Sequence, residues 1–124
     1  MNLSVRRKNS YESRVEAGMA FFDRHYPNWI DAIKIESIDV SIDEDCPGCQ
    51  VTNCKVFAVA LAVMGIGDEQ AIELGIFLPG VWKIEERYAA LTDIWKRMIE
   101  EKLLLRELES VPAADEETLE LVEV

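Results

Sequence analysis

The feature that most constrains the fold is a long run of helical periodicity between residues 84 and 109. Apolar side chains recur there at alternating spacings of four and three, namely at Ile84, Tyr88, Leu91, Trp95 and Met98. As one helix this segment is about 37 Å long. A helix of this length with one apolar face must bury that face against other elements, and the remaining segments also read as helices, so we predict an all-α domain.

Shorter helices are predicted before it, over residues 11 to about 25, 28 to about 33, 54–64 and 68–74. We expect Ser10 to cap the first of them, Gly65 or Gly67 to end the third and Asp68 to cap the fourth. Residues 33–42 mix two patterns, and we predict a loop because a single strand without a partner cannot form a sheet. Acids, Pro47 and Gly48 predict an irregular, cysteine-bearing loop over residues 43–53. The helix at 54–64 is apolar around its whole axis, so we expect it at the centre of a bundle of about four or five helices, with the long C-terminal helix packed along it.

Length and composition fit one domain. The chain has 124 residues, of which 49% are hydrophobic, and it can bury a sizeable core without metal or disulfides. We divide it into a flexible N-terminus (1–10), a single helical domain (11–109) and an acidic mobile tail (110–124). From Glu107 onward there are seven acidic residues and no basic one, and we expect mobility beyond Pro112.

The charge and the apolar stretches restrict the partners. A net charge of -11 opposes binding to nucleic acid and to anionic membranes. The basic start of the chain has no apolar run behind it, and the longest apolar stretch, residues 56–64, is shorter than the roughly 20 residues that span a bilayer. We therefore expect a cytoplasmic protein with a protein partner and no direct contact with nucleic acid or membrane.

Four segments carry a resemblance to known proteins: residues 14–18 (RVEAG), 29–31 (WID), 71–77 (AIELGIF) and 88–95 (YAALTDIW). With a cysteine-bearing turn, they resemble a group of small hypothetical proteins of actinobacteria and their phages. The resemblance covers about residues 11–101. Those proteins carry Val-Leu-Gly-Gln after a cysteine, whereas Cys54 is followed here by Lys55, Val56 and Phe57. The resemblance implies the fold and a phage or bacterial cytoplasmic origin, and no activity.

Three cysteines form the only cluster with metal-binding spacing. Cys46 and Cys49 are separated by two residues, as in a zinc knuckle, and Cys54 follows. The fourth ligand would be His25 or one of the acids at 43–45. The alternative is that the cysteines simply pack in a turn beneath the third helix. The acids oppose a low thiol pKa, and they therefore disfavour redox catalysis.

Several apolar residues are candidates for a partner surface. Trp82 follows a turn and is expected to be partly exposed beside Phe77, whereas Trp95 belongs to the core stripe. Leu104 and Leu105, with Leu103, exceed what a small bundle covers, so they either meet the first helix or contact a second copy or partner.

No catalytic motif accompanies these residues, since the single His25 lacks a serine in a Gly-x-Ser-x-Gly context and no phosphate-binding loop occurs. We therefore expect a non-enzymatic protein-binding protein, an adaptor or inhibitor, whose partner is a host protein or a second copy. The alternative is a zinc-binding structural or regulatory protein. A third possibility is a DNA mimic that uses the acids between residues 31 and 73.

Overall fold

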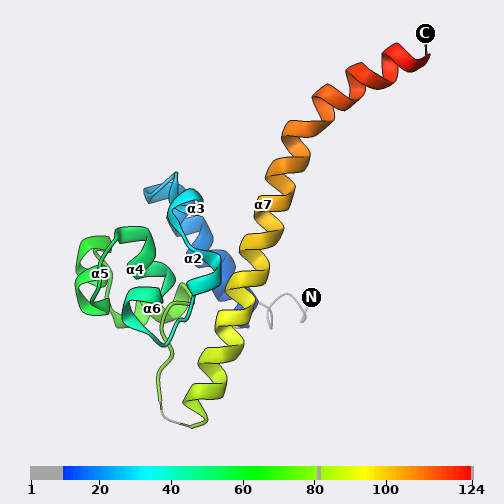
Figure 1. Ribbon diagram of the computed structural model, residues 1–124. Coiled ribbons are helices and arrows are strands. Elements are labelled where there is room, and N and C mark those ends of the chain that lie inside the picture. Colours follow the sequence, from blue (N-terminus) through cyan, green and yellow to red (C-terminus); the bar gives the residue numbers. More distant parts are fainter. Residues whose placement is uncertain (1–9, 81, 124) are drawn as a thin grey trace, which may run out of the picture.

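The computed structural model describes residues 10–80 and 82–123, and side chains within 10–80 and 82–109. Its α-helices are α2 (Tyr11–His25), α3 (Trp29–Ala32), α4 (Pro47–Thr52), α5 (Phe57–Met64), α6 (Asp68–Glu73) and α7 (Ile84–Glu123) (Figure 1). Two 3-10 turns, η1 (Ile35–Ser37) and η2 (Asp43–Asp45), lie between α3 and α4. The described part of the chain contains no strand, which confirms the all-α fold with a long C-terminal helix.

The predicted division of the chain is only partly covered by these residues. The flexible N-terminus lies outside them except for Ser10, and the mobile tail lies beyond the last described side chain. The helix α7 continues past the predicted end at Glu109. Among the described helices none combines the length and the apolar character that crossing a membrane requires.

Local sequence signals set several helix ends as predicted. Ser10 begins α2, and its hydroxyl accepts a hydrogen bond of 3.1 Å from the backbone N–H of Ser13. Gly65 ends α5 with a φ of 74°, a left-handed conformation that glycine adopts without strain. The start of α6 differs, because Gly67 is the N-cap and Asp68 is the first helical residue.

The core lies where α7 runs along α2. Leu91, Trp95 and Ile99 of α7 are fully buried, and so are Val15 and Phe22 of α2. The ring centroids of Phe22 and Trp95 are 5.9 Å apart. The smaller helices lie to one side of this pair (Figure 1). Leu91 and Trp95 of the predicted stripe are therefore confirmed as core, whereas Ile84, Tyr88 and Met98 are partly buried and pack against it.

A close crossing fixes α2 against the end of α6. A Cβ atom on Gly18 would lie 2.2 Å from the carbonyl oxygen of Leu74, so only glycine fits there. The next residue, Gly75, has a φ of 74°, and its carbonyl accepts a 2.7 Å hydrogen bond from the indole nitrogen of Trp95. Three elements therefore meet at one point.

The helix α5 is peripheral, which corrects the prediction that it is central. Only Ala60 and Leu61 of α5 are buried, and its main contact is with α4. Figure 1 places it on the side of the body that is farthest from α7. The apolar side chains around α5 predicted a buried helix. Within the described part of the single chain, however, no element covers the outer face of α5.

The segment 43–53 is more regular than the expected loop. Cys46 takes an extended conformation as N-cap, Pro47 follows in the first turn, and Asn53 ends α4 with a φ of 61°. Proline fits the first helical turn because its missing N–H has no partner there, so the residues that suggested a turn in fact start a helix. The loop at 33–42 contains η1 and no strand; the hydroxyl of Thr92 accepts a 2.9 Å hydrogen bond from the backbone N–H of Val40.

The crossing at Gly18 generates the first prediction. We expect Gly18→Ser to lower the free energy of unfolding by about 1–3 kcal/mol. The cost of overpacking at the crossing outweighs the better helix propensity of serine. The matched control is Gly67→Ser, where no atom lies within 4 Å of the new Cβ and serine is a good N-cap. Urea unfolding followed by circular dichroism measures both. Equal stabilities for the two variants would contradict the role of the crossing.

Candidate protein-interaction surface

The helix α7 is attached to the body by its buried stripe and by ion pairs along its edge. Arg97 pairs with Glu12 of α2. The Lys102 ammonium lies 3.5 Å from the Asp23 carboxylate of α2. These pairs are about half exposed, so each contributes little free energy and chiefly orients the helix.

A third pair marks how far this attachment reaches. Arg106 lies 3.0 Å from the Asp31 carboxylate of α3. This pair lies farther along α7 than those of Arg97 and Lys102. The C-terminal part of α7, beyond this pair, extends past α3 (Figure 1).

Three leucines of α7 face solvent near this point. Leu104, Leu105 and Leu108 are 55%, 59% and 52% exposed. Leu104 follows the buried Trp95 by nine residues, which is about two and a half helical turns, so the two side chains point to opposite sides. The helix geometry therefore prevents Leu104 from reaching the core. We call these three residues the leucine face.

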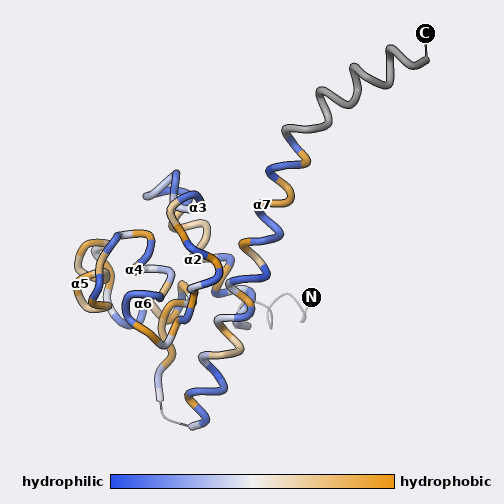
Figure 2. The backbone as a smooth tube through the Cα atoms, in the orientation of Figure 1, coloured by the Kyte–Doolittle hydropathy of each residue, from blue (hydrophilic) through white to orange (hydrophobic). Residues whose placement is uncertain are grey.

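We predicted that Leu103, Leu104 and Leu105 either meet the first helix or contact a second copy or partner. The three side chains differ in their surroundings. Leu103 is partly buried and packs against the core. Leu105 borders an open hollow of about 270 Å³ together with Met19 and Ala20 of α2. Leu104 faces solvent. Figure 2 shows the hydrophobic positions on this part of α7 among hydrophilic ones.

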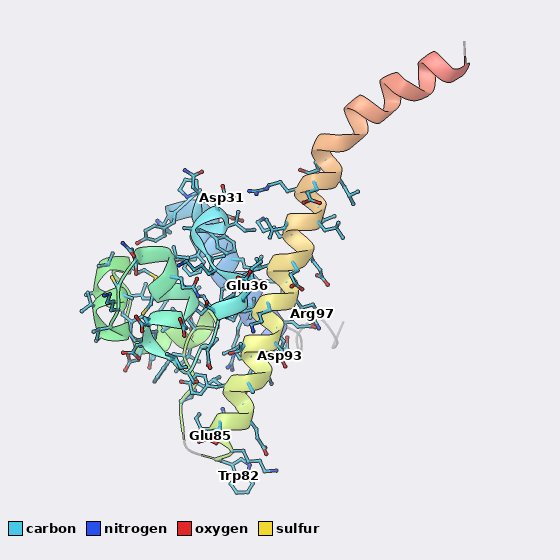
Figure 3. The ribbon with its side chains drawn as sticks, viewed as in Figure 1. Asp31, Glu36, Trp82, Glu85, Asp93 and Arg97 are labelled. Carbon is cyan, nitrogen blue, oxygen red and sulfur yellow. The ribbon has the colours of Figure 1, made fainter. Side chains whose placement is uncertain are left out.

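Trp82 is a separate exposed residue. It is 74% exposed, as expected, and the ammonium of Lys83 lies 5.6 Å from its ring centroid. Figure 3 shows it at the start of α7. The 20 residues between Ile84 and Leu104 place the leucine face about 30 Å away along the helix. Trp82 and the leucines are therefore not parts of one patch.

Phe77 belongs to the packing of the body and does not join Trp82 in an exposed patch. Its ring is partly buried and stacks on that of Phe57 with centroids 5.7 Å apart. Leu78, the next residue, is buried. The backbone N–H of Leu78 donates to the Tyr88 hydroxyl at 3.1 Å. The segment before the turn is thus folded back onto α5 and α7.

The three cysteines lie around α4, and two of them are fully buried. Burial raises the pKa of Cys46 to about 12, and its thiol donates to the Ile76 carbonyl at 3.7 Å. Burial, with the charges of Asp43 and Cys54, raises the pKa of Cys49 to about 11. Cys54 is partly exposed and shares a hollow of about 280 Å³ with Cys49. The two buried thiols are therefore protonated at neutral pH.

His25, the expected fourth zinc ligand, lies at the end of α2 with its ring centroid 4.5 Å from that of Phe21. It borders a different hollow, with Val51, from the one that contains Cys49 and Cys54. Within the described side chains, no three His, Cys, Asp or Glu residues are grouped so as to hold a metal ion. The zinc site stays a prediction and gains no support from the geometry.

An exposed surface that the sequence analysis did not identify lies on α5. Val59 and Val63 are 50% and 55% exposed, although the apolar run that contains them predicted a buried helix. The signal available in the sequence was the lack of any polar residue in this helix, which can indicate a buried helix or an interface equally well.

The chain was compared with protein-family models, with curated proteins and with solved structures, and none of them matches it. The resemblance to actinobacterial and phage proteins therefore stays a prediction. The geometry and charge of this chain are the basis on which its function can be inferred.

Thiol reactivity tests the described burial of the cysteines. At pH 8 we expect a thiol reagent to modify Cys54 rapidly, while Cys46 and Cys49 react only as the protein opens, because their thiols are buried and protonated. Mass spectrometry of digested protein identifies each modified site. In denaturant all three should react at similar rates, and equally fast labelling of Cys49 and Cys54 in the native protein would contradict the structure.

Proposed function

We propose that this chain is a small, acidic, non-enzymatic protein-binding protein, an adaptor or inhibitor of the phage or bacterial cytoplasm. The observation that carries the proposal is the leucine face on α7. Three large apolar side chains are each more than half exposed on a helix that extends past the rest of the body. Exposed apolar clusters of this kind are typical of surfaces that partners bury.

The arrangement suits a partner with an apolar groove. Leu104 and Leu108 are separated by one helical turn, and Leu105 lies beside them, which is the spacing with which a helix docks into a groove. Acidic side chains surround them, at Glu100, Glu101, Glu107 and Glu109. A groove rimmed by basic residues is therefore the complementary surface, because opposite charges steer association and exclude wrong partners.

Charge supports a protein partner over nucleic acid. The net charge of -11 repels a phosphate backbone, and the basic residues Lys102 and Arg106 near the leucine face are paired with carboxylates of the body. Mimicry of DNA would need ordered carboxylates in a regular array, and a solvated acidic surface explains the same composition. We therefore rank DNA mimicry behind protein binding through the leucine face.

A capture experiment tests the proposal. Tagged protein is incubated with a lysate of an actinobacterial host, with and without competing duplex DNA. Leu104→Glu combined with Leu105→Glu should abolish capture and leave the circular dichroism unchanged, since both side chains face solvent. The control Ala89→Glu with Ala90→Glu adds the same charges at exposed positions of α7 and should capture normally. If the leucine variant captures the partner as well as the unmodified chain does, the proposal is overturned. If competing duplex DNA abolishes capture by the unmodified chain, DNA mimicry is favoured instead.

Metal content tests the zinc alternative independently. Cys49 and Cys54 line one hollow, but no third or fourth ligand is grouped with them among the described side chains. For protein purified without chelator, we expect less than stoichiometric zinc, because the buried cysteines favour the protonated state that does not bind metal. Stoichiometric zinc that is lost in Cys49→Ser would instead establish the alternative.

A further inference from the structure

The outward face of α5 is entirely apolar. Val56, Val59 and Val63 are each about half exposed, and the small residues Ala58 and Ala62 between them are exposed as well. The eight residues of α5 include no polar side chain. A helix on the surface of a monomer normally turns charged residues to water, so this face has the composition of a surface that is covered.

The exposed valines form one stripe, which we call the valine face. They are spaced by three and four residues, so they lie along one side of the helix for about 10 to 12 Å. Ala60 and Leu61 occupy the other side and are buried against the body. Figure 2 shows that this helix is hydrophobic along its length.

The charges at the two ends of the valine face have opposite signs. Lys55 lies just before α5, and Asp68 and Glu69 follow it at the start of α6; all three are exposed. They take part in none of the ion pairs formed among the described side chains. In an antiparallel pair of α5 helices, Lys55 of each copy approaches Asp68 and Glu69 of the other, and the two helix dipoles also run in opposite directions.

Net charge limits where two copies can meet. Two chains of charge -11 repel each other, so contact is favoured where the surface is uncharged and its flanks are complementary. We propose that the valine face pairs with the valine face of a second copy in an antiparallel, two-fold symmetric contact. The face is smaller than a standard interface of about 1,600 Å², so the pair forms with a dissociation constant in roughly the micromolar range or above.

This pairing goes beyond the proposed protein-binding function and does not depend on it. The helix α5 lies on the side of the body away from α7 (Figure 1), so paired copies keep both leucine faces accessible. A pair then presents two sites for partners, which raises the overall avidity for a partner that is itself dimeric or repetitive.

Sedimentation equilibrium of the full chain tests the pairing. From about 10 µM to 1 mM, the weight-average mass should rise from 14.1 kDa towards twice that value. Val59→Glu with Val63→Glu should stay at 14.1 kDa at all concentrations with unchanged circular dichroism, because both positions are exposed. The control Leu104→Glu with Leu105→Glu should pair like the unmodified chain.

A charge swap tests the antiparallel arrangement. Lys55→Glu alone should weaken pairing by roughly tenfold at low salt, since two attractive contacts become repulsive. Adding Asp68→Lys and Glu69→Lys to that chain should restore it. The proposal is overturned if the unmodified chain is strictly monomeric. It is also overturned if the leucine variant abolishes pairing and the valine variant keeps it. A swap variant weaker than Lys55→Glu alone would overturn the antiparallel geometry.

Discussion

The structure depends on the contact between α2, the end of α6 and α7 at Gly18, Gly75 and Trp95. The lack of a side chain at Gly18 lets the carbonyl of Leu74 approach α2 closely, and the left-handed Gly75 turns its own carbonyl towards the Trp95 indole. An indole N–H that is buried without an acceptor costs free energy, so this hydrogen bond keeps the tryptophan in the core. The segments 14–18, 71–77 and 88–95 of the chain meet at this contact.

Predictions from the sequence succeed where a local signal determines the result. The serine cap of α2, the glycine that ends α5 and the spacing of Leu91 and Trp95 each act within a few residues, and the structure confirms them. The position of α5 was predicted incorrectly because hydrophobic periodicity identifies apolar side chains without identifying what covers them. The helix α4 was missed because proline favours both turns and the first turn of a helix.

The candidate surface was predictable to a similar degree. The exposure of Leu104 follows from helix geometry once Trp95 is assigned to the core, since nine residues place them on opposite sides. Phe77 could not be placed in this way, because its burial depends on Phe57, which is distant in sequence. The cysteines illustrate the same limit: spacing brings Cys46 and Cys49 together on α4, but their burial and raised pKa depend on the tertiary fold.

The position of the leucine face also affects the stability of the helix that carries it. Most of the stability of a protein helix comes from burying an apolar face, because isolated helical turns are marginal in water. Up to Arg106 the body supplies that burial through Leu91, Trp95 and Ile99 and the flanking ion pairs. At Leu104 and Leu108 the apolar surface is exposed, and a partner that covers it stabilises the same turns that present it. If the leucine face binds a partner as proposed, that binding stabilises this part of α7, and the free energy of helix formation there is included in the affinity.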